Sequence, residues 1–153
     1  TTALCLGVVS DLLDQGHITS GQSFLDLGTG SGVLGIACCK SGLSGLGLDI
    51  DPLAVDNALE NQALNQADGF TAALGGIEVV AGRSFDLVLA NILARPLTEL
   101  APAVAAARKS EGCLVLSGLL EIQADGVEAA YTAQGLSAAR RIIEGEWCAL
   151  VWD

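Results

Sequence analysis

The chain has 153 residues, of which 51% are apolar and 16% charged, so it is long enough for one domain with a sizeable core and is neither disordered nor fibrous. Seven Lys and Arg residues against 18 Asp and Glu residues give a net charge of −11. An anionic chain without a basic patch cannot neutralise a phosphate backbone, so direct binding to nucleic acid is disfavoured. A cationic ligand or a Lys- and Arg-rich protein would be attracted, and the alternative is that the acidity only keeps the chain soluble.

The sequence lacks the marks of a membrane protein, a secreted protein or a zinc protein. No apolar run reaches the ~18 residues of a membrane span, and no signal peptide precedes the first helix. The five cysteines form no C-x-x-C pair and His17 is the one histidine, so we expect reduced cysteines in a cytoplasmic protein that holds no metal. The chain begins Thr1-Thr2 and contains no Met, so we expect a piece of a longer protein.

Helices and strands are predicted to alternate along the chain. In the first half, apolar spacing predicts a helix over 2–15, a strand over 24–27, a helix over 31–41, a strand over 46–48, and a helix that Asp51 caps and Pro52 begins. The residues of that last helix expected to face the core are Val55, Ala58, Leu59 and Ala63. The second half predicts a strand at 70–74 or 77–80, a strand over 85–90, one helix through Leu97, Leu100, Ala101 and Val104, a strand over 113–117 and a helix over 122–131.

The end of the chain follows a different pattern. Two strand-like runs, 136–143 and 147–152, are joined by residues 144–146, a connection too short for a helical crossover, so they should pair antiparallel at one edge of the sheet. The alternation before them predicts a parallel sheet covered on both faces. We therefore expect residues 1–153 to form one doubly wound, Rossmann-like α/β domain.

The strongest chemical signal is the segment Asp26-Leu27-Gly28-Thr29-Gly30-Ser31-Gly32, where the first strand turns into a helix. Glycines let the backbone approach a ligand and the helix N-terminus offers free N–H groups, so Gly28, Gly30 and Gly32 predict a nucleotide-like cofactor. The carboxylate of Asp26 would repel the pyrophosphate of NAD and attract an ammonium or sulfonium. S-adenosylmethionine (AdoMet) carries both cations and no phosphate, so it is the predicted cofactor, with a plain turn between strand and helix as the alternative.

Polar residues also end two later strands. Asp49 lies 21 residues after Gly28, at the end of the second strand, where its carboxylate can accept hydrogen bonds from both ribose hydroxyls. Asn91 follows the strand over 85–90, and its side-chain oxygen can accept an N–H from an incoming amine and direct the lone pair at a methyl group. The alternatives are an unpaired loop carboxylate at Asp49 and an ordinary turn residue at Asn91.

Several segments together resemble one known family. They are the glycine segment, Thr1-Thr2-Ala3-Leu4-Cys5-Leu6, Leu48-Asp49-Ile50-Asp51-Pro52, Ala90-Asn91-Ile92-Leu93-Ala94, Leu116-Ser117-Gly118 and Glu144-Gly145-Glu146-Trp147. Over nearly its whole length the chain looks like the catalytic domain of the bacterial ribosomal protein L-eleven methyltransferases, the PrmA type. The glycine segment alone indicates a class I methyltransferase, whereas the Asn-Ile-Leu-Ala and Glu-Trp segments are specific to the family.

The resemblance implies AdoMet-dependent N-methylation of lysine side chains and an N-terminal amine on a large-subunit ribosomal protein. It implies cofactor contacts at Thr2, Gly28, Asp49 and Asn91. From the residues themselves we expect Asn91 to be the catalytic residue that orients the amine, with Asp26 and Asp49 fixing the cofactor. The family normally has a separate N-terminal substrate-recognition domain, which we expect to be absent here, and usually has glycine where this chain has Arg95. The alternatives are another class I N-methyltransferase and a cofactor-binding fragment without turnover of its own.

Overall fold

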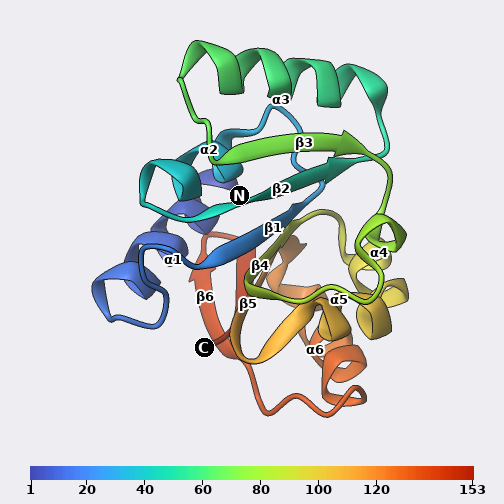
Figure 1. The fold of residues 1–153 in the computed structure, drawn as a ribbon. Coiled ribbons are helices and arrows are strands. Elements are labelled where there is room, and N and C mark those ends of the chain that lie inside the picture. The colour runs from blue at the N-terminus through green and yellow to red at the C-terminus, as the bar shows by residue number, and fades with distance from the viewer.

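The computed structural model describes residues 1–153, built around a seven-stranded sheet with strand order β3-β2-β1-β4-β5-β7-β6 (Figure 1). The strands are β1 (Ser23–Leu27), β2 (Ser44–Asp49), β3 (Phe70–Leu74), β4 (Phe85–Asn91), β5 (Arg108–Leu120), β6 (Arg140–Glu144) and β7 (Trp147–Trp152). The helices are α1 (Thr2–Asp14), α2 (Val33–Lys40), α3 (Pro52–Leu64), α4 (Ala94–Glu99), α5 (Ala101–Ala107) and α6 (Ala124–Thr132), with short 3₁₀ turns η1 (Ile77–Val80) and η2 (Glu121–Gln123).

The pairing of the strands confirms the predicted fold class. Strands β1 to β5 pair in parallel, whereas β7 runs antiparallel to both of its neighbours, β5 and β6. The chain order of the strands reverses between β1 and β4, because β2 and β3 lie on one side of β1 and the later strands lie beyond β4. At such a reversal the connections leave in opposite directions, and a crevice opens at the carboxyl ends of the strands.

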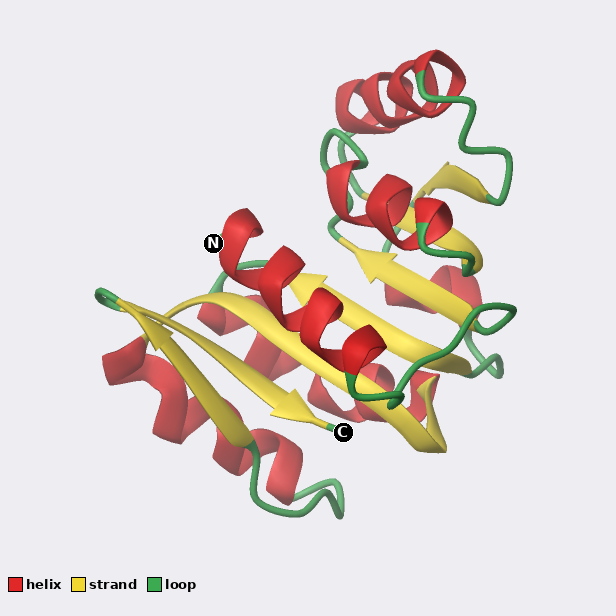
Figure 2. Ribbon diagram, turned by 90° about the vertical axis from the view of Figure 1, so that its left-hand side faces the viewer, coloured by secondary structure: helices red, strands yellow, loops and turns green.

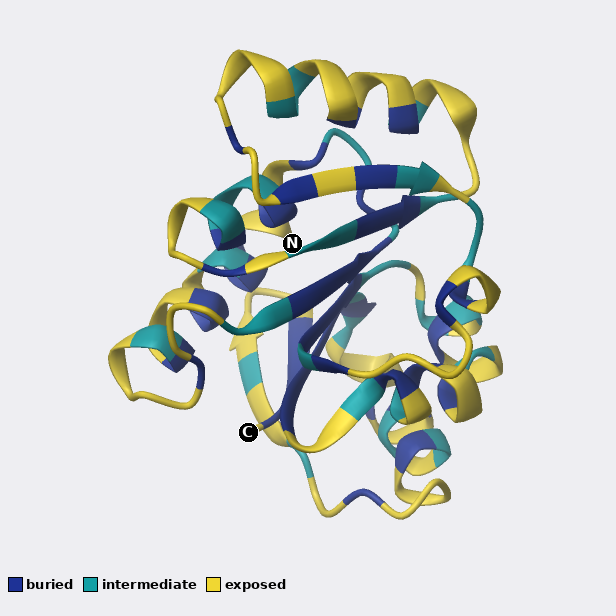
Figure 3. Ribbon diagram, in the orientation of Figure 1, coloured by how far each residue is buried: buried dark blue, intermediate teal, exposed yellow.

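Helices cover both faces of the sheet (Figure 2). The core on one face lies under α1, α2 and α3, where the rings of Phe24 and Phe70 stack with centres 6.1 Å apart. The other face packs against α4, α5 and α6, where Tyr131 lies 5.6 Å from Trp152. Because both faces are covered, the central strands are buried along most of their length, as the dark ribbons of Figure 3 show.

Of the four α3 residues predicted to face the core, two are buried and two are not. Val55 and Ala58 are buried, but Leu59 is 38% exposed and Ala63 is exposed as well. The side of the helix beyond Ala58 is occupied by polar residues, among them Asn61, whose side-chain N–H donates to the Ser31 main-chain oxygen at 2.9 Å. The rotation of α3 therefore satisfies main-chain acceptors and leaves two apolar side chains in water, so the outer face of the helix is exposed (Figure 3).

Three further elements differ from the prediction, one of them β5, which covers Arg108–Leu120 where a strand over 113–117 was expected. The single helix expected after β4 breaks at Leu100 into α4 and α5, because Pro102 has no N–H to continue the hydrogen-bond ladder. The strand expected over 136–143 begins only at Arg140. Before it, the Ala139 N–H donates to the Glu128 side chain at 2.9 Å, so main-chain groups there bond to side chains in place of a strand. Of the two candidate strands after α3, 70–74 is β3 and 77–80 is the turn η1.

Candidate functional site

The glycine segment after β1 folds into a tight turn that leads into α2. Gly28, Gly30 and Gly32 have φ angles of 75°, 55° and 86°, a region that residues with a Cβ rarely adopt. A Cβ at Gly28 would collide with the side chain of Ile92 after β4, and a Cβ at Gly32 would lie 3.2 Å from the Phe70 ring. A Cβ at Gly30 would meet no atom within 4 Å. The turn therefore brings β1 close to the end of β4 and leaves free space beside Gly30.

Asp49 connects this turn to the end of β2. Its Oδ2 accepts a hydrogen bond from the Gly30 N–H at 2.9 Å, and its Oδ1 accepts one from the Asp51 N–H at 3.0 Å. Asp51 caps α3 as predicted, because its side chain accepts from the Leu53 N–H at 3.0 Å. A carboxylate oxygen offers more than one lone pair, so Asp49 is held in position and can still accept from a ligand.

A cavity of about 370 Å³ opens beside Asp49 at the carboxyl ends of β1, β2 and β3. Its walls include Gly28, Asp49, Ile50, Gly76, Ile92 and Leu93. Apart from Asp49 these are apolar side chains and glycine backbone, and Ile50 and Leu93 are 80% and 71% exposed. Apolar walls around one carboxylate suit a ligand with a flat ring and a pair of hydroxyl groups.

Asp26 lies under the glycine turn and is fully buried. Its Oδ2 accepts a hydrogen bond from the Thr29 hydroxyl at 2.8 Å, while its Oδ1 has no partner. Burial raises the pKa of the Asp26 carboxyl to about 6, and the negative charge of Asp49 adds to the rise. A buried carboxylate with an unpartnered oxygen gives this end of the sheet a negative charge that a cationic ligand would offset.

Asn91 lies at a second cavity, of about 360 Å³, lined by Thr1, Asn91, Ile92, Leu93, Gly118 and Trp147. Ile92 and Leu93 line both cavities, so the end of β4 separates the cavity with Asp49 from the cavity with Asn91. Both polar atoms of the Asn91 amide are hydrogen-bonded. Its Nδ2 donates to the Thr2 hydroxyl at 3.3 Å, and its Oδ1 accepts from the Ser117 hydroxyl at 2.9 Å.

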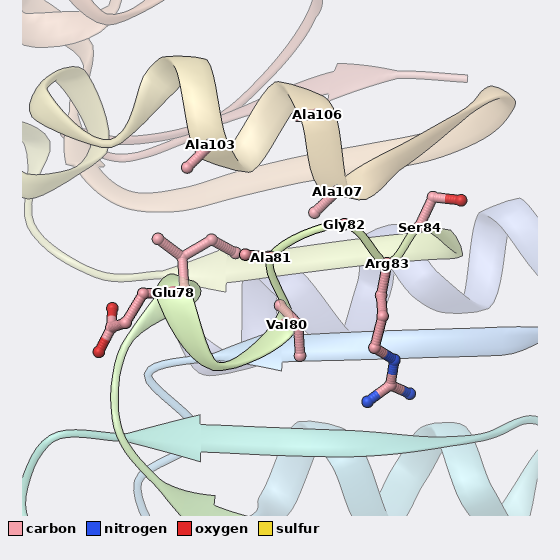
Figure 4. A pocket seen from close by; sticks show the side chains of 10 residues that line it. Glu78, Val80, Ala81, Gly82, Arg83, Ser84, Ala103, Ala106 and Ala107 are labelled. Atoms are coloured by element: carbon pink, nitrogen blue, oxygen red, sulfur yellow. The ribbon is translucent and has the colours of Figure 1, made fainter.

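A third cavity, of about 430 Å³, lies between η1 and α5 and has none of these features (Figure 4). Its wall is formed mainly by Val80, Ala81, Ala103, Ala106 and Ala107. Glu78 and Arg83 extend away from the alanines, and the Arg83 guanidinium lies 5.2 Å from the centre of the Phe85 ring. The polar side chains at its edge, Glu78, Arg83 and Ser84, point in different directions, so no group of them converges on a ligand.

Other possible sites are also without support. No group of three or more His, Cys, Asp or Glu side chains gathers in a way that could hold a metal ion, and all five cysteines are unpaired thiols. No helix is both long and apolar enough to cross a membrane. Arg95 points into solvent with 89% of its side chain exposed, and it pairs with Glu99 at 3.0 Å.

Comparison with known proteins decides the family. A family model described as ribosomal protein L11 methyltransferase (PrmA) matches residues 1–153, the whole chain. The chain belongs to the PrmA family.

Individual relatives agree with this assignment. A ribosomal protein L11 methyltransferase of Brucella abortus (strain S19) is 42% identical over 156 residues, which cover 98% of this chain and 54% of the relative. One from Chloroflexus aurantiacus is 38% identical over 177 residues, covering 99% of this chain and 52% of the relative. The crystal structure of ribosomal protein L11 methylase from Lactobacillus delbrueckii subsp. bulgaricus superposes with a TM-score of 0.89 at 29% identity, covering 99% of this chain and 76% of that one. The chain spans about half the length of the curated relatives it matches.

The residues that the resemblance to the PrmA family singled out lie at one end of the sheet. Gly28 and Asp49 line the first cavity, Asn91 lines the second, and Thr2 bonds to Asn91. Of the remaining predicted site residues, Asp26 and Gly32 are buried and Gly30 donates to Asp49.

Some residues at these cavities have no role predicted from the sequence. Trp147, the glycines after β3 and Ser117 are the main ones. Ser117 left one signal in the sequence, because a lone hydroxyl followed by glycine ends the apolar run over 113–117. Its position opposite Asn91 in the β4–β5 register appears only in the structure.

Proposed function

We propose that this chain is the AdoMet-binding catalytic domain of an N-methyltransferase that modifies lysine side chains and the N-terminal amine of ribosomal protein L11. The observation that carries the proposal is the pair of cavities that adjoin at Ile92 and Leu93, one holding Asp49 and the other Asn91. Two adjoining cavities suit a reaction in which a cofactor and a second substrate meet. Membership of the PrmA family supports ribosomal protein L11 as the substrate, because the relatives are described as ribosomal protein L11 methyltransferases.

The residues around the first cavity fit AdoMet. The Asp49 carboxylate keeps free lone pairs for the two ribose hydroxyls, and the side chains of Ile50 and Leu93 offer apolar surface to an adenine ring. The unpartnered Oδ1 of Asp26 adds negative charge that favours a cationic ligand. When bound, AdoMet supplies a methyl group that its sulfonium centre already activates for attack.

The residues around the second cavity suit an amine. Asn91 Oδ1, with one hydrogen bond from Ser117, keeps a lone pair that can accept an amine N–H and so orient the nitrogen lone pair. The indole of Trp147 offers an apolar surface, 38% exposed, to the methylene groups of a lysine. Together these two residues would hold the nitrogen and the stem of one side chain.

No dedicated base faces this cavity. Its lining side chains include no carboxylate, imidazole or lysine amine. His17 lies near Asp153, beyond the far end of β7 from Trp147, and a strand of this length separates the two by about 20 Å. A lysine amine with an ordinary pKa of about 10.4 would therefore lose its proton to solvent before it binds in the neutral form.

In this proposal a separate N-terminal domain positions the ribosomal protein at the site. The net charge of −11 favours a basic substrate surface, and the resemblance implies a separate N-terminal domain that recognises the ribosomal protein. Because a displacement of about 1 Å can cost on the order of a hundredfold in rate, we expect these 153 residues alone to bind AdoMet but to methylate L11 slowly. Full activity from this chain would place substrate recognition within it.

The test combines a binding and a turnover measurement. Calorimetric titration should detect binding of AdoMet and none of NAD. Transfer of labelled methyl groups to ribosomal protein L11 should fall at least about tenfold in Asn91→Ala and stay unchanged in Asn65→Ala, an exposed asparagine at the end of α3. Binding of NAD without AdoMet would overturn the proposal. Binding of AdoMet with methyl transfer to a different amine, or to none, would favour the two alternatives, another N-methyltransferase or a cofactor-binding fragment.

A further inference from the structure

Asn91 is held by hydroxyl groups from two different elements. Thr2, in the first turn of α1, accepts from its Nδ2 at 3.3 Å, and Ser117, near the end of β5, donates to its Oδ1 at 2.9 Å. Asn91 and Ser117 are direct partners in the parallel β4–β5 register, so the short bond follows from the strand pairing. The amide therefore has a defined orientation before any ligand binds.

Ser117 is unusual in its surroundings. It is fully buried, at 0% exposure, in a strand whose neighbouring residues Leu114, Val115 and Leu116 are equally buried and apolar. A buried hydroxyl is unfavourable unless it is hydrogen-bonded, so packing alone would favour alanine here. The one side-chain hydrogen bond that its hydroxyl donates goes to Asn91.

Two neighbours complete the arrangement. The Cys5 thiol of α1 is a neighbour of Ser117, and burial raises the pKa of that thiol to about 12, so the group beside the hydroxyl is uncharged at neutral pH. Gly118 allows the close packing, because a Cβ there would lie 3.2 Å from Asn91 Oδ1 and 2.6 Å from the Ile92 main-chain oxygen.

The direction of the amide matters for the proposed reaction. An asparagine side chain rotated by 180° would present an N–H group where its oxygen now lies, and a donor cannot accept the N–H of an amine. We propose that Ser117 is a positioning residue whose hydroxyl fixes the Asn91 amide with its oxygen toward β5, so that an acceptor faces the incoming amine. The effect of Ser117 on turnover rests on the proposed function. The fixed orientation of the Asn91 amide does not, because it is a property of the chain itself.

Two measurements test the orientation of the Asn91 amide and its effect on turnover separately. Nuclear magnetic resonance of the ¹⁵N-labelled chain follows the side-chain amide of Asn91, assigned by the loss of its signals in Asn91→Asp. In Ser117→Ala these two signals should shift and their exchange with water should speed up. In Cys113→Ala, which truncates a buried side chain on the same face of β5 and removes no contact to Asn91, they should stay in place. Unchanged Asn91 signals in a folded Ser117→Ala would overturn the inference, whether or not the chain is a methyltransferase.

Turnover provides the second readout. The kcat for methyl transfer to ribosomal protein L11 should fall about ten- to a hundredfold in Ser117→Ala, while the KM for AdoMet changes less than about threefold. Ser117→Thr keeps the hydroxyl and should restore both the Asn91 signals and most of the rate, which also covers the case in which the alanine variant does not fold. A kcat loss no larger than that of Cys113→Ala, or a threonine variant that loses the Asn91 signals, would overturn the positioning role. Absence of methyl transfer in the unmodified chain would count against the proposed function, and the resonance measurement would still decide the role of Ser117.

Discussion

Replacing Asp26 with asparagine should stabilise the ligand-free chain at neutral pH and weaken its binding of AdoMet. The carboxyl is fully buried, one oxygen accepts from Thr29, and the other has no partner. Asparagine keeps the size of the side chain and an acceptor for Thr29, but it removes the charge. The ligand-free chain would then lose a buried charge, and the cofactor site would lose a negative group.

The expected size of the effect follows from the pKa of Asp26. Its rise from 3.8 to about 6 corresponds to about 3 kcal/mol of lost stability at pH 7. Because the folded-state pKa is raised, the folded chain binds the proton more tightly than the unfolded chain. The penalty is present in full above about pH 6 and shrinks as the pH falls toward 3.8, and about 1.4 kcal/mol of it is regained by pH 5. The thiols of Cys5 and Cys38 beside Asp26 have raised pKa values and stay neutral over this range.

Urea unfolding of both proteins at pH 7 and pH 5 measures this effect. The asparagine N–H group without a partner costs about 1 to 2 kcal/mol, so the variant should be about 1 to 2 kcal/mol more stable at pH 7. The difference should shrink by about 1.4 kcal/mol at pH 5. AdoMet binding, measured by calorimetry at pH 7, should weaken about tenfold, whereas Glu60→Gln on the exposed side of α3 should change neither quantity. A stability difference that is the same at both pH values would refute the presence of a buried, unpartnered carboxylate.

Three further outcomes are expected. Asp49→Ala should weaken AdoMet binding by about 1 to 3 kcal/mol in calorimetry, whereas Asp51→Ala should cost about 1 kcal/mol of stability through the lost helix cap and leave the affinity alone; equal affinity losses would contradict the ribose assignment. Tyr131→Phe removes a hydrogen bond of 2.8 Å to a main-chain oxygen of α4, which should cost about 1 to 2 kcal/mol of stability. The melting temperature should fall by roughly 2 to 4 °C for each kcal/mol lost, and an unchanged melting temperature would show that the hydroxyl adds nothing. Gly118→Ala should destabilise the chain by at least about 1 kcal/mol in urea, because φ is 85° and a Cβ would press on a main-chain oxygen; wild-type stability would mean that strand β5 relaxes freely at this position.

The sequence predicted the fold well wherever one local rule applied. The continuous apolar run of β4 identifies a strand buried on both faces, and the short connection before Trp147 requires an antiparallel hairpin. Prediction was weaker where tertiary contacts chose between local options. The exposed Leu59 on α3 shows this, because the helix is rotated to let Asn61 bond to a main-chain oxygen of the glycine turn.

The functional site was also predicted only in part from the sequence. The order of strand, glycine turn and helix, with Asp49 and Asn91 at the ends of later strands, was enough to predict a cofactor at the carboxyl edge of a parallel sheet, because side chains that follow parallel strands gather at one edge. The sequence alone did not predict that Asp26 is enclosed under the turn or that Ser117 bonds to Asn91. Those facts depend on the register between strands and on how closely α1 packs on the sheet, and both are set by contacts between residues that lie far apart in the chain.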